Sequence, residues 1–152
     1  MERIYLDTSV FGGYFDTEFE LWSKLLFDKI IKGDYILLYS QLTEIELNKA
    51  PEHVKELVKQ IPEKYIEYVA ITTQAYAVAD QYVKENVVGK SSIEDCRHIA
   101  LATLNNADIL VSWNFKHIVN VNRIRGYNSI NYRLGHKILE IRTPREILYY
   151  ED

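Results

Sequence analysis

Carboxylates that are widely separated in the chain stand at the ends of predicted elements. Asp7 follows a short apolar run, a glutamate lies in the helical segment after Ser40, and Asp95 lies near the start of a later helix. Carboxylates that meet in one place repel one another unless a cation lies between them, and Mg²⁺ binds through one or two carboxylates together with water. A cation held there activates water and stabilises the charge that develops on a phosphodiester. The pattern therefore favours a metal-dependent hydrolytic site.

Two glutamates compete for the second position of this site. Glu44 and Glu46 are two residues apart in a predicted helix, which places them about 200° apart around its axis, so only one can point at the site. Asn114, after the predicted strand 109–112, can add an amide oxygen that brings no charge. Each residue alone also has a structural explanation, because aspartate and asparagine form turns and caps and glutamate is usually a solvated helix residue. The inference of a hydrolytic site therefore rests on all of these residues together.

The elements that would position these residues alternate along the chain. Apolar runs predict strands at 3–6, 35–39, 65–71, 109–112 and 138–141. Helical spacing predicts helices at 17–33, 41–49, 51–62, 72–86 and 92–104, with Ser40 as an N-cap and capping-box patterns at 17–20 and 92–95. Residues 8–13 are expected to form a loop. Residues 119–134 should form a broken helix, because four asparagines and Gly126 dilute its periodicity. Thr143-Pro144-Arg145-Glu146 predicts the start of a short terminal helix.

Strands separated by helices predict an α/β fold. Such connections give a mainly parallel sheet with helices on both faces, and we expect a single domain over residues 1–152. Ligands of such sheets bind outside the carboxyl ends of the strands. Asp7 and residues 112–114 should both emerge there, so the site is expected at that edge.

Composition excludes several classes of protein. Hydrophobic residues make up 47% of the 152 residues and charged residues 26%, which is typical of a folded soluble domain and not of a disordered or fibrous chain. No apolar run reaches the roughly 18–20 residues that span a bilayer. Cys96 is the only cysteine, so an internal disulfide and a multi-thiolate zinc site are excluded. We expect a cytoplasmic protein that is not bound to a membrane.

The charge is unevenly distributed. The formal net charge is −4, yet residues 116–145 contain seven Lys and Arg residues and one Glu. This basic stretch can be a solvated helix face with cations near helix C-termini, or it can contact a polyanion. Charge alone does not decide between these two interpretations.

The joint pattern resembles the PIN-domain nucleases, specifically the VapC-like toxins of type II toxin–antitoxin systems. Ile4-Tyr5-Leu6-Asp7-Thr8-Ser9 looks like the family's strand that ends in the first catalytic Asp. Thr43-Glu44-Ile45-Glu46-Leu47 resembles the second segment, where the acid precedes Leu, so Glu46 fits better than Glu44. The segments 94–102 and 107–114 resemble the third and fourth, with Asp95 as the third acid. Many relatives carry Asp where this chain has Asn114, which leaves less charge for a second metal ion.

The resemblance implies a fold, an activity and partners. The fold would be a PIN-like three-layer α/β/α arrangement with a mainly parallel central sheet. The activity would be that of a Mg²⁺- or Mn²⁺-dependent endoribonuclease, often a homodimer and often silenced by a cognate antitoxin. In this interpretation Asp7, Glu46 and Asp95 hold the metal and Asn114 orients the attacking water.

Further residues are candidates for contact with RNA. Thr8 and Ser9 could contribute hydroxyl or backbone contacts, and His98, one helical turn after Asp95, could reach the phosphate or the metal or instead pack behind the site. His117 could approach a scissile phosphate or lie in a surface loop. Basic residues interleaved with tyrosines are typical of backbone contact and base stacking. Those with this pattern are Lys116, Arg123 and Arg125.

Other functions compete with the nuclease interpretation. Phosphatases of the haloacid-dehalogenase type also start from an Asp after the first strand, but they need a second Asp where this chain has Ser9. A retroviral-type aspartic protease is disfavoured by the many helices. A third alternative is a PIN-like module that binds RNA or docks a protein and whose catalytic site is weakened at Asn114. A measurement of metal affinity would distinguish it from an enzyme, because a binding module need not bind Mg²⁺.

Overall fold

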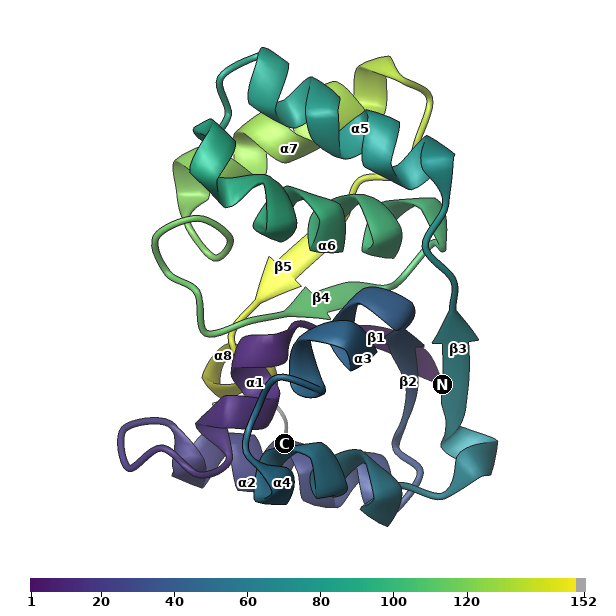
Figure 1. Cartoon of the computed structure of the whole chain (residues 1–152), viewed down its shortest axis with the longest axis vertical. Helices are drawn as coiled ribbons and strands as arrows, with labels where there is room; N and C mark the ends of the chain where they lie inside the picture. Colours follow the sequence, from purple (N-terminus) through teal and green to yellow (C-terminus); the bar gives the residue numbers. More distant parts are fainter. Residues whose placement is uncertain (150–152) are drawn as a thin grey trace.

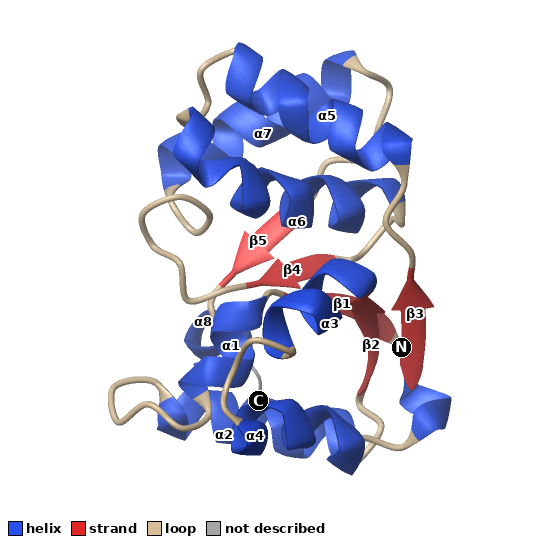
Figure 2. Cartoon of the chain, in the orientation of Figure 1, coloured by secondary structure: helices blue, strands red, loops and turns tan. Residues whose placement is uncertain are grey.

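The computed structural model describes residues 1–149 and has one sheet between two layers of helices (Figures 1 and 2). The sheet has the order β3-β2-β1-β4-β5, and each neighbouring pair is parallel. Its strands are β1 (Glu2–Leu6), β2 (Tyr35–Ser40), β3 (Ile66–Val69), β4 (Ile109–Val111) and β5 (Glu140–Arg142). The predicted α/β class and parallel sheet are therefore confirmed.

The helices divide between the two faces because successive residues of a strand point to opposite sides. Tyr5 of β1 packs in one buried cluster, whereas Ile4 and Leu6 pack in the other. The cluster around Tyr5 is covered by α5 (Thr73–Lys84), α6 (Ile93–Leu104) and α7 (Val121–Arg133). The second cluster is covered by α1 (Thr8–Gly13), α2 (Glu20–Ile31), α4 (Glu52–Lys55) and α8 (Pro144–Tyr149).

The register brings the carboxyl ends of the central strands together. Leu6 at the end of β1 lies opposite Val111 at the end of β4. The N–H of Asp7 donates to the carbonyl of Val111 at 3.2 Å, so the pairing continues into the first residue after the strand. Helix α3 (Gln41–Leu47) starts directly from the end of β2 at the same edge. Residues from three strands and the helices that follow them therefore meet at one place.

Two predicted elements were wrong. Residues 8–13 form the helix α1 rather than a loop, with Asp7 at its N-cap position. Residues 121–133 form one unbroken helix, α7, because its asparagines bond to neighbouring groups instead of interrupting the helix. Asn120 caps its first turn, and the amide of Asn128 donates to the carbonyl of Leu139 at 2.8 Å. Gly126 lies where an added Cβ would be 2.8 Å from Cγ1 of Val87, so this glycine permits close packing.

The predicted caps had mixed outcomes. Ser40 caps α3, since its Oγ accepts from the N–H of Thr43 at 3.0 Å. Thr143 and Glu146 form the expected reciprocal capping box of α8. The side chain of Ser92 does not cap α6, and α2 begins after Phe19 rather than at a capped residue 17. Residues 52–60 form α4 and a following 3₁₀ segment instead of one long helix. Within residues 1–149 no helix is both long and apolar enough to cross a membrane.

Candidate active site

Asp7 is a buried carboxylate held by two serines from distant parts of the chain, Ser9 in α1 and Ser112 directly after β4. Its side chain belongs to a residue that is only 5% exposed, directly after β1. Oδ1 accepts from Ser9 Oγ at 2.6 Å, and Oδ2 accepts from Ser112 Oγ at 2.7 Å. Burial raises the pKa of Asp7, although His98 and the two serine hydroxyls partly offset this effect. The structure thus holds a carboxylate in a position where its charge is costly.

Glu46, and not Glu44, bonds to residues close to the other two acids in the chain, namely Thr8 after Asp7 and His98 after Asp95. Its Oε1 accepts from Thr8 Oγ1 and from His98 Nε2, each at 2.5 Å. Burial alone would raise the pKa of Glu46, but the hydrogen bond and charge of His98 outweigh it and the net shift is downward. Glu44 is exposed and faces the other way, where it helps burial raise the pKa of Tyr39 to about 12. The orientation of α3 about its axis therefore places Glu46 at the site and Glu44 away from it.

Asp95 on α6 lies within electrostatic reach of the other two acids. Burial raises the pKa of Asp95, and the negative charge of Glu46 raises it further. Asp95 in turn raises the pKa of Asp7. His117 and His98 act in the opposite direction and favour the charged form of Asp95. The three acids predicted from the sequence therefore lie at the carboxyl edge of the sheet, where Glu46 acts on Asp95 and Asp95 acts on Asp7.

Asn114 is placed beside Asp95, and its side-chain oxygen already accepts one hydrogen bond. Oδ1 accepts from the N–H of His117 at 3.0 Å, and the backbone N–H of Asn114 donates to Ser112 Oγ at 2.9 Å. A side-chain hydrogen bond from Asn114 stabilises the charged form of Asp95. An amide oxygen has a second lone pair, so the use of Oδ1 to orient a water stays a prediction.

His98 does not face the substrate side of the site. It is 3% exposed, with Nδ1 at 2.7 Å from the hydroxyl of Tyr5 and Nε2 on Glu46. Both ring nitrogens are therefore occupied, and the expectation that His98 binds substrate is wrong. The alternative role, packing behind the site, is the observed one, and the ring orients Glu46.

The hydroxyls of Thr8 and Ser9 also belong to the support of the acids. Thr8 Oγ1 donates to Glu46, and Ser9 Oγ donates to Asp7 while accepting from the N–H of Trp113 at 2.9 Å. Their hydroxyls therefore hold carboxylates. The expectation that these hydroxyls contact RNA is corrected accordingly.

Ser112 and His117 lie near the acids, although the sequence predicted only the place of Ser112 and left the role of His117 open. Ser112 is fully buried and binds Asp7, and its position at the end of β4 was the available signal. His117 is partly buried in the loop between β4 and α7, and it lies near enough to Asp95 to lower the pKa of that carboxyl. Its Nδ1 atom is buried and has no hydrogen-bond partner among residues 1–149.

The basic candidates fall into two groups. Arg123 donates from Nη1 to the carbonyl of Val87 and so joins α7 to the segment after α5. This contact is structural, which weakens its assignment to RNA. Lys116 and Arg125 are exposed. The basic stretch is therefore partly a structural feature and partly an accessible surface.

The donor set fits a hydrated divalent cation rather than an ion enclosed by protein ligands. Among residues 1–149, no three His, Cys, Asp or Glu side chains are grouped closely enough to form a ready-made metal site. Burial nevertheless raises the pKa values of Asp7 and Asp95, and a neighbouring acid raises each further, Asp95 for Asp7 and Glu46 for Asp95, so their ionisation is costly. A cation between such carboxylates relieves this cost, and Mg²⁺ keeps several waters and needs only one or two carboxylates.

Comparison with known proteins adds evidence on the fold. No protein-family model matches the chain, and no curated protein matches it. Three similar solved structures cover nearly the whole of both chains. The first, VapBC2 from Rickettsia felis bound to a promoter DNA fragment, is 12% identical with a TM-score of 0.55 and covers 93% of this chain and 98% of that one. FitAcB from Neisseria gonorrhoeae is 14% identical with a TM-score of 0.60 and coverages of 93% and 97%.

The third similar structure is DNA-bound VapBC from Salmonella typhimurium. It is 18% identical, with a TM-score of 0.54, and covers 95% of this chain and 99% of that one. Identities this low establish architecture and not activity. The chain therefore has a PIN-like α/β fold, with three acids at the edge of the sheet where that architecture places a ligand.

Proposed function

We propose that this protein is a Mg²⁺- or Mn²⁺-dependent endoribonuclease of the VapC-like PIN family and the toxin of a toxin–antitoxin pair. The convergence of Asp7, Glu46 and Asp95 at the carboxyl edge of the sheet carries this proposal. The fold supports it, since similar chains occur in VapBC and FitAcB complexes. A cognate antitoxin, a homodimer and action in the cytoplasm belong to the same proposal.

The three acids would hold the cation, and each has its own support. Ser9 and Ser112 fix the two oxygens of Asp7, and Thr8 and His98 fix Glu46. Such outer contacts orient metal ligands and commonly change metal affinity 10- to 100-fold when removed, by order of magnitude. When bound, the cation would supply a Lewis acid and an activated water for hydrolysis of the phosphodiester.

Charge balance explains why the site would need this cation. Burial and the charge of a neighbouring acid raise the pKa values of Asp7 and Asp95, so both charges are costly in the unliganded protein. The hydrogen bond from Asn114 and the proximity of His117 lower the pKa of Asp95 and so partly offset this cost. A bound cation would offset the rest.

RNA cleavage tests the proposal directly. A mixed pool of single-stranded RNA is incubated with the purified protein in Mg²⁺, Mn²⁺ or EDTA, alongside Asp7→Asn and Asp95→Asn. We expect cleavage in either metal, none in EDTA, and none by the two variants. Glu44→Gln is the matched control, because Glu44 is exposed on the same helix as Glu46, and it should cleave like the wild type. Equal cleavage by wild type and both variants would identify a contaminating nuclease.

A binding module is the second candidate. Asn114 stands where an acid would add charge, and its Oδ1 is bonded to the N–H of His117. A site weakened in this way could bind RNA or a protein without hydrolysis. A folded wild-type protein that binds RNA but stays inert in both metals would favour this function over the nuclease.

A further inference from the structure

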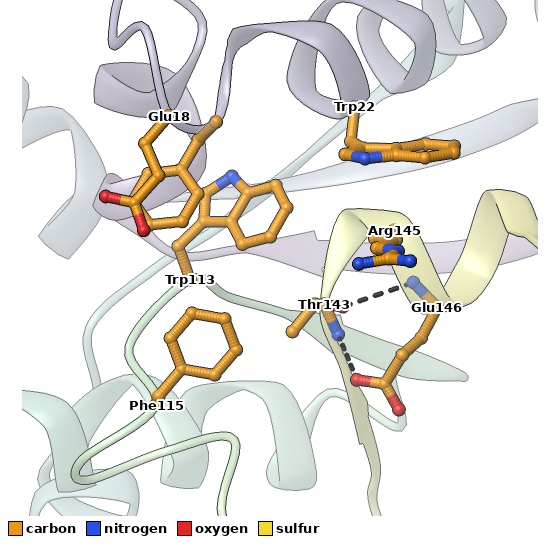
Figure 3. Close-up of a pocket in the computed structure, with 8 residues that line it drawn as sticks. Glu18, Trp22, Trp113, Phe115, Thr143, Arg145 and Glu146 are labelled. Atoms are coloured by element: carbon orange, nitrogen blue, oxygen red, sulfur yellow. Dashed lines mark hydrogen bonds between the residues drawn. The ribbon is translucent and has the colours of Figure 1, made fainter.

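The structure contains an aromatic pocket of about 730 Å³ (Figure 3). Its walls come from the start of α2, the segment after β4 and the start of α8. Figure 3 shows Trp113 and Phe115 facing Trp22 and Arg145 across the opening. We refer to it as the aromatic pocket. Its lining includes Glu18, Phe19, Trp22, Trp113, Phe115 and Arg145.

The aromatic rings of one wall are held in fixed positions. Phe19 and Trp113 are stacked, with ring centroids 4.5 Å apart and planes at 23°. The indole Nε1 of Trp113 donates to the buried Ser23 Oγ at 2.9 Å. Gly13 lies so close to this indole that an added Cβ would be 2.8 Å from it. This wall is therefore rigid before any ligand arrives, which lowers the entropic cost of binding.

Phe115 offers an exposed ring next to this wall. Its side chain is 53% exposed, although its centroid lies 6.2 Å from that of Trp113 and 6.3 Å from that of Phe19. An exposed aromatic ring beside a fixed stack provides a free face for one more flat group. Every nucleobase has such a face, and base–aromatic stacking is the usual way in which proteins hold unstacked bases.

Hydrogen bonds connect the pocket to the acids. The N–H of Trp113 donates to Ser9 Oγ at 2.9 Å, and the same Oγ donates to Asp7 at 2.6 Å. Asn114, which bonds to Asp95, lies between Trp113 and Phe115 in the chain. Residues 113–115 thus connect the wall of the pocket to Asp7 and Asp95, and this connection favours a base at the pocket when the neighbouring phosphate lies at the acids.

The polar groups of the pocket suit the edge of a base. The Arg145 guanidinium lies 5.9 Å from the ring centroid of Trp22, and Glu18 brings a carboxylate to the opposite side. A guanidinium donates to base carbonyls and ring nitrogens, whereas a carboxylate accepts from amino and imino groups. Grooves that receive a protein helix present mainly apolar anchor sites. Flat walls with charged groups at the rim favour a nucleobase instead.

We propose that the aromatic pocket binds one unstacked base of single-stranded RNA, next to the phosphate at the three acids. This inference rests on the proposed function and assigns a base-binding subsite to it. Phe115 stacks on the base, and Arg145 and Glu18 contact its edge.

Binding in EDTA tests the subsite without cleavage. Fluorescence anisotropy measures the affinity of a labelled short oligoribonucleotide for wild type, Phe115→Ala and Phe115→Tyr. We expect Phe115→Ala to bind about tenfold more weakly, as the loss of one stacked base predicts, and Phe115→Tyr to bind like the wild type. Tyr68→Ala is the matched control, since Tyr68 is an exposed aromatic residue on β3 at the other edge of the sheet. Circular dichroism checks that all variants are folded.

A series of oligonucleotides with a single abasic position assigns the effect to a base. For wild type we expect one abasic position to weaken binding about tenfold, and for Phe115→Ala that position should have no further effect. Equal affinity of Phe115→Ala and wild type, or no binding of RNA by the wild type, would overturn the subsite. An effect of Phe115→Ala on self-association in sedimentation, with RNA affinity unchanged, would also overturn it and identify a protein interface.

The outcomes separate the subsite from the proposed function. If the abasic and Phe115 results agree but the wild type does not cleave RNA in Mg²⁺ or Mn²⁺, the subsite stands and the nuclease assignment fails. If the wild type cleaves and Phe115→Ala binds RNA normally, the nuclease assignment stands and the subsite fails.

Discussion

Nε2 of His98 lies 2.5 Å from Oε1 of Glu46, and this contact joins α6 to α3 at the edge of the sheet. An ionised carboxylate only accepts hydrogen bonds, so the ring nitrogen donates. On the other side of the ring, Nδ1 lies 2.7 Å from the Tyr5 hydroxyl, which lies 2.7 Å from Ser40 Oγ. Ser40 is the N-cap of α3. The same buried chain of polar groups thus starts the helix that carries Glu46 and orients its carboxylate.

Two substitutions of His98 separate the two sides of its ring. In His98→Asn the amide can replace Nδ1 and keep Tyr5 but cannot reach Glu46, whereas in His98→Gln it can replace Nε2 and keep Glu46. We expect His98→Asn to lower Mn²⁺ affinity about 10- to 100-fold and His98→Gln to lower it much less. Both should lose about 1–3 kcal/mol of unfolding free energy, because each leaves one buried group without its partner. Calorimetry and urea unfolding measure the two quantities.

Equal loss of Mn²⁺ affinity in the two variants would contradict the orienting role of His98. Equal retention of affinity would show that Glu46 is held without this contact.

Asp7→Asn should stabilise the protein in the absence of metal. Burial raises the pKa of Asp7 above its ordinary value of 3.8, so the native state holds this proton to a higher pH than the unfolded state does. Stability therefore falls as the pH rises from 3.8 through the raised pKa, and the full cost of the charge is present above it. Asn carries no charge and avoids this cost. Urea unfolding in EDTA should show a gain for the variant that is larger at about pH 7.5 than at about pH 4.

Adding Mg²⁺ provides the control for this experiment. A cation that binds only the native wild type stabilises it by mass action, so the gap between wild type and Asp7→Asn should narrow or reverse. A variant that is less stable than the wild type in EDTA, and more so at the higher pH, would contradict the assigned cost of the Asp7 charge.

The strands and the polar residues that follow them could be predicted from the sequence. A short apolar run that ends at Asp7 or at Ser112 is typical of a buried strand that stops at the edge of a sheet. The choice between Glu44 and Glu46 could not be made from residue spacing, since it depends on how α3 rotates against the sheet. The role of His98 likewise depends on Tyr5 and Glu46, which come from distant parts of the chain. Tertiary hydrogen bonds therefore decided what local patterns had left open.

The asparagines of α7 show the same limit. They weaken helical propensity, so residues 119–134 were expected to form a broken helix. In the structure Asn131 accepts from the Tyr82 hydroxyl and donates to Thr103 Oγ1 at 3.2 Å, which stabilises an unbroken helix. Helix propensity does not include stabilisation by hydrogen bonds to neighbouring helices, so it could not predict this outcome.

Asn131→Ala should therefore be strongly destabilising. The substitution leaves the buried Tyr82 hydroxyl without its acceptor and opens a small cavity between α5, α6 and α7. We expect a loss of about 2–4 kcal/mol in the free energy of unfolding, from an unpaired buried group and lost packing. Asn122→Ala is the control, since Asn122 is exposed on the same helix and should change stability by less than about 0.5 kcal/mol. Similar losses in both variants would contradict the role of Asn131.

Binding of Mn²⁺ to the purified protein tests whether Asp7, Glu46 and Asp95 together hold a divalent cation. Calorimetric titration compares wild type with Asp7→Asn, Glu46→Gln, Asp95→Asn and the control Glu44→Gln. We expect saturable binding by wild type and by Glu44→Gln, and at least about tenfold weaker binding by each of the other three. Binding that is insensitive to Asp7, Glu46 and Asp95, or that is lost equally in Glu44→Gln, would contradict it.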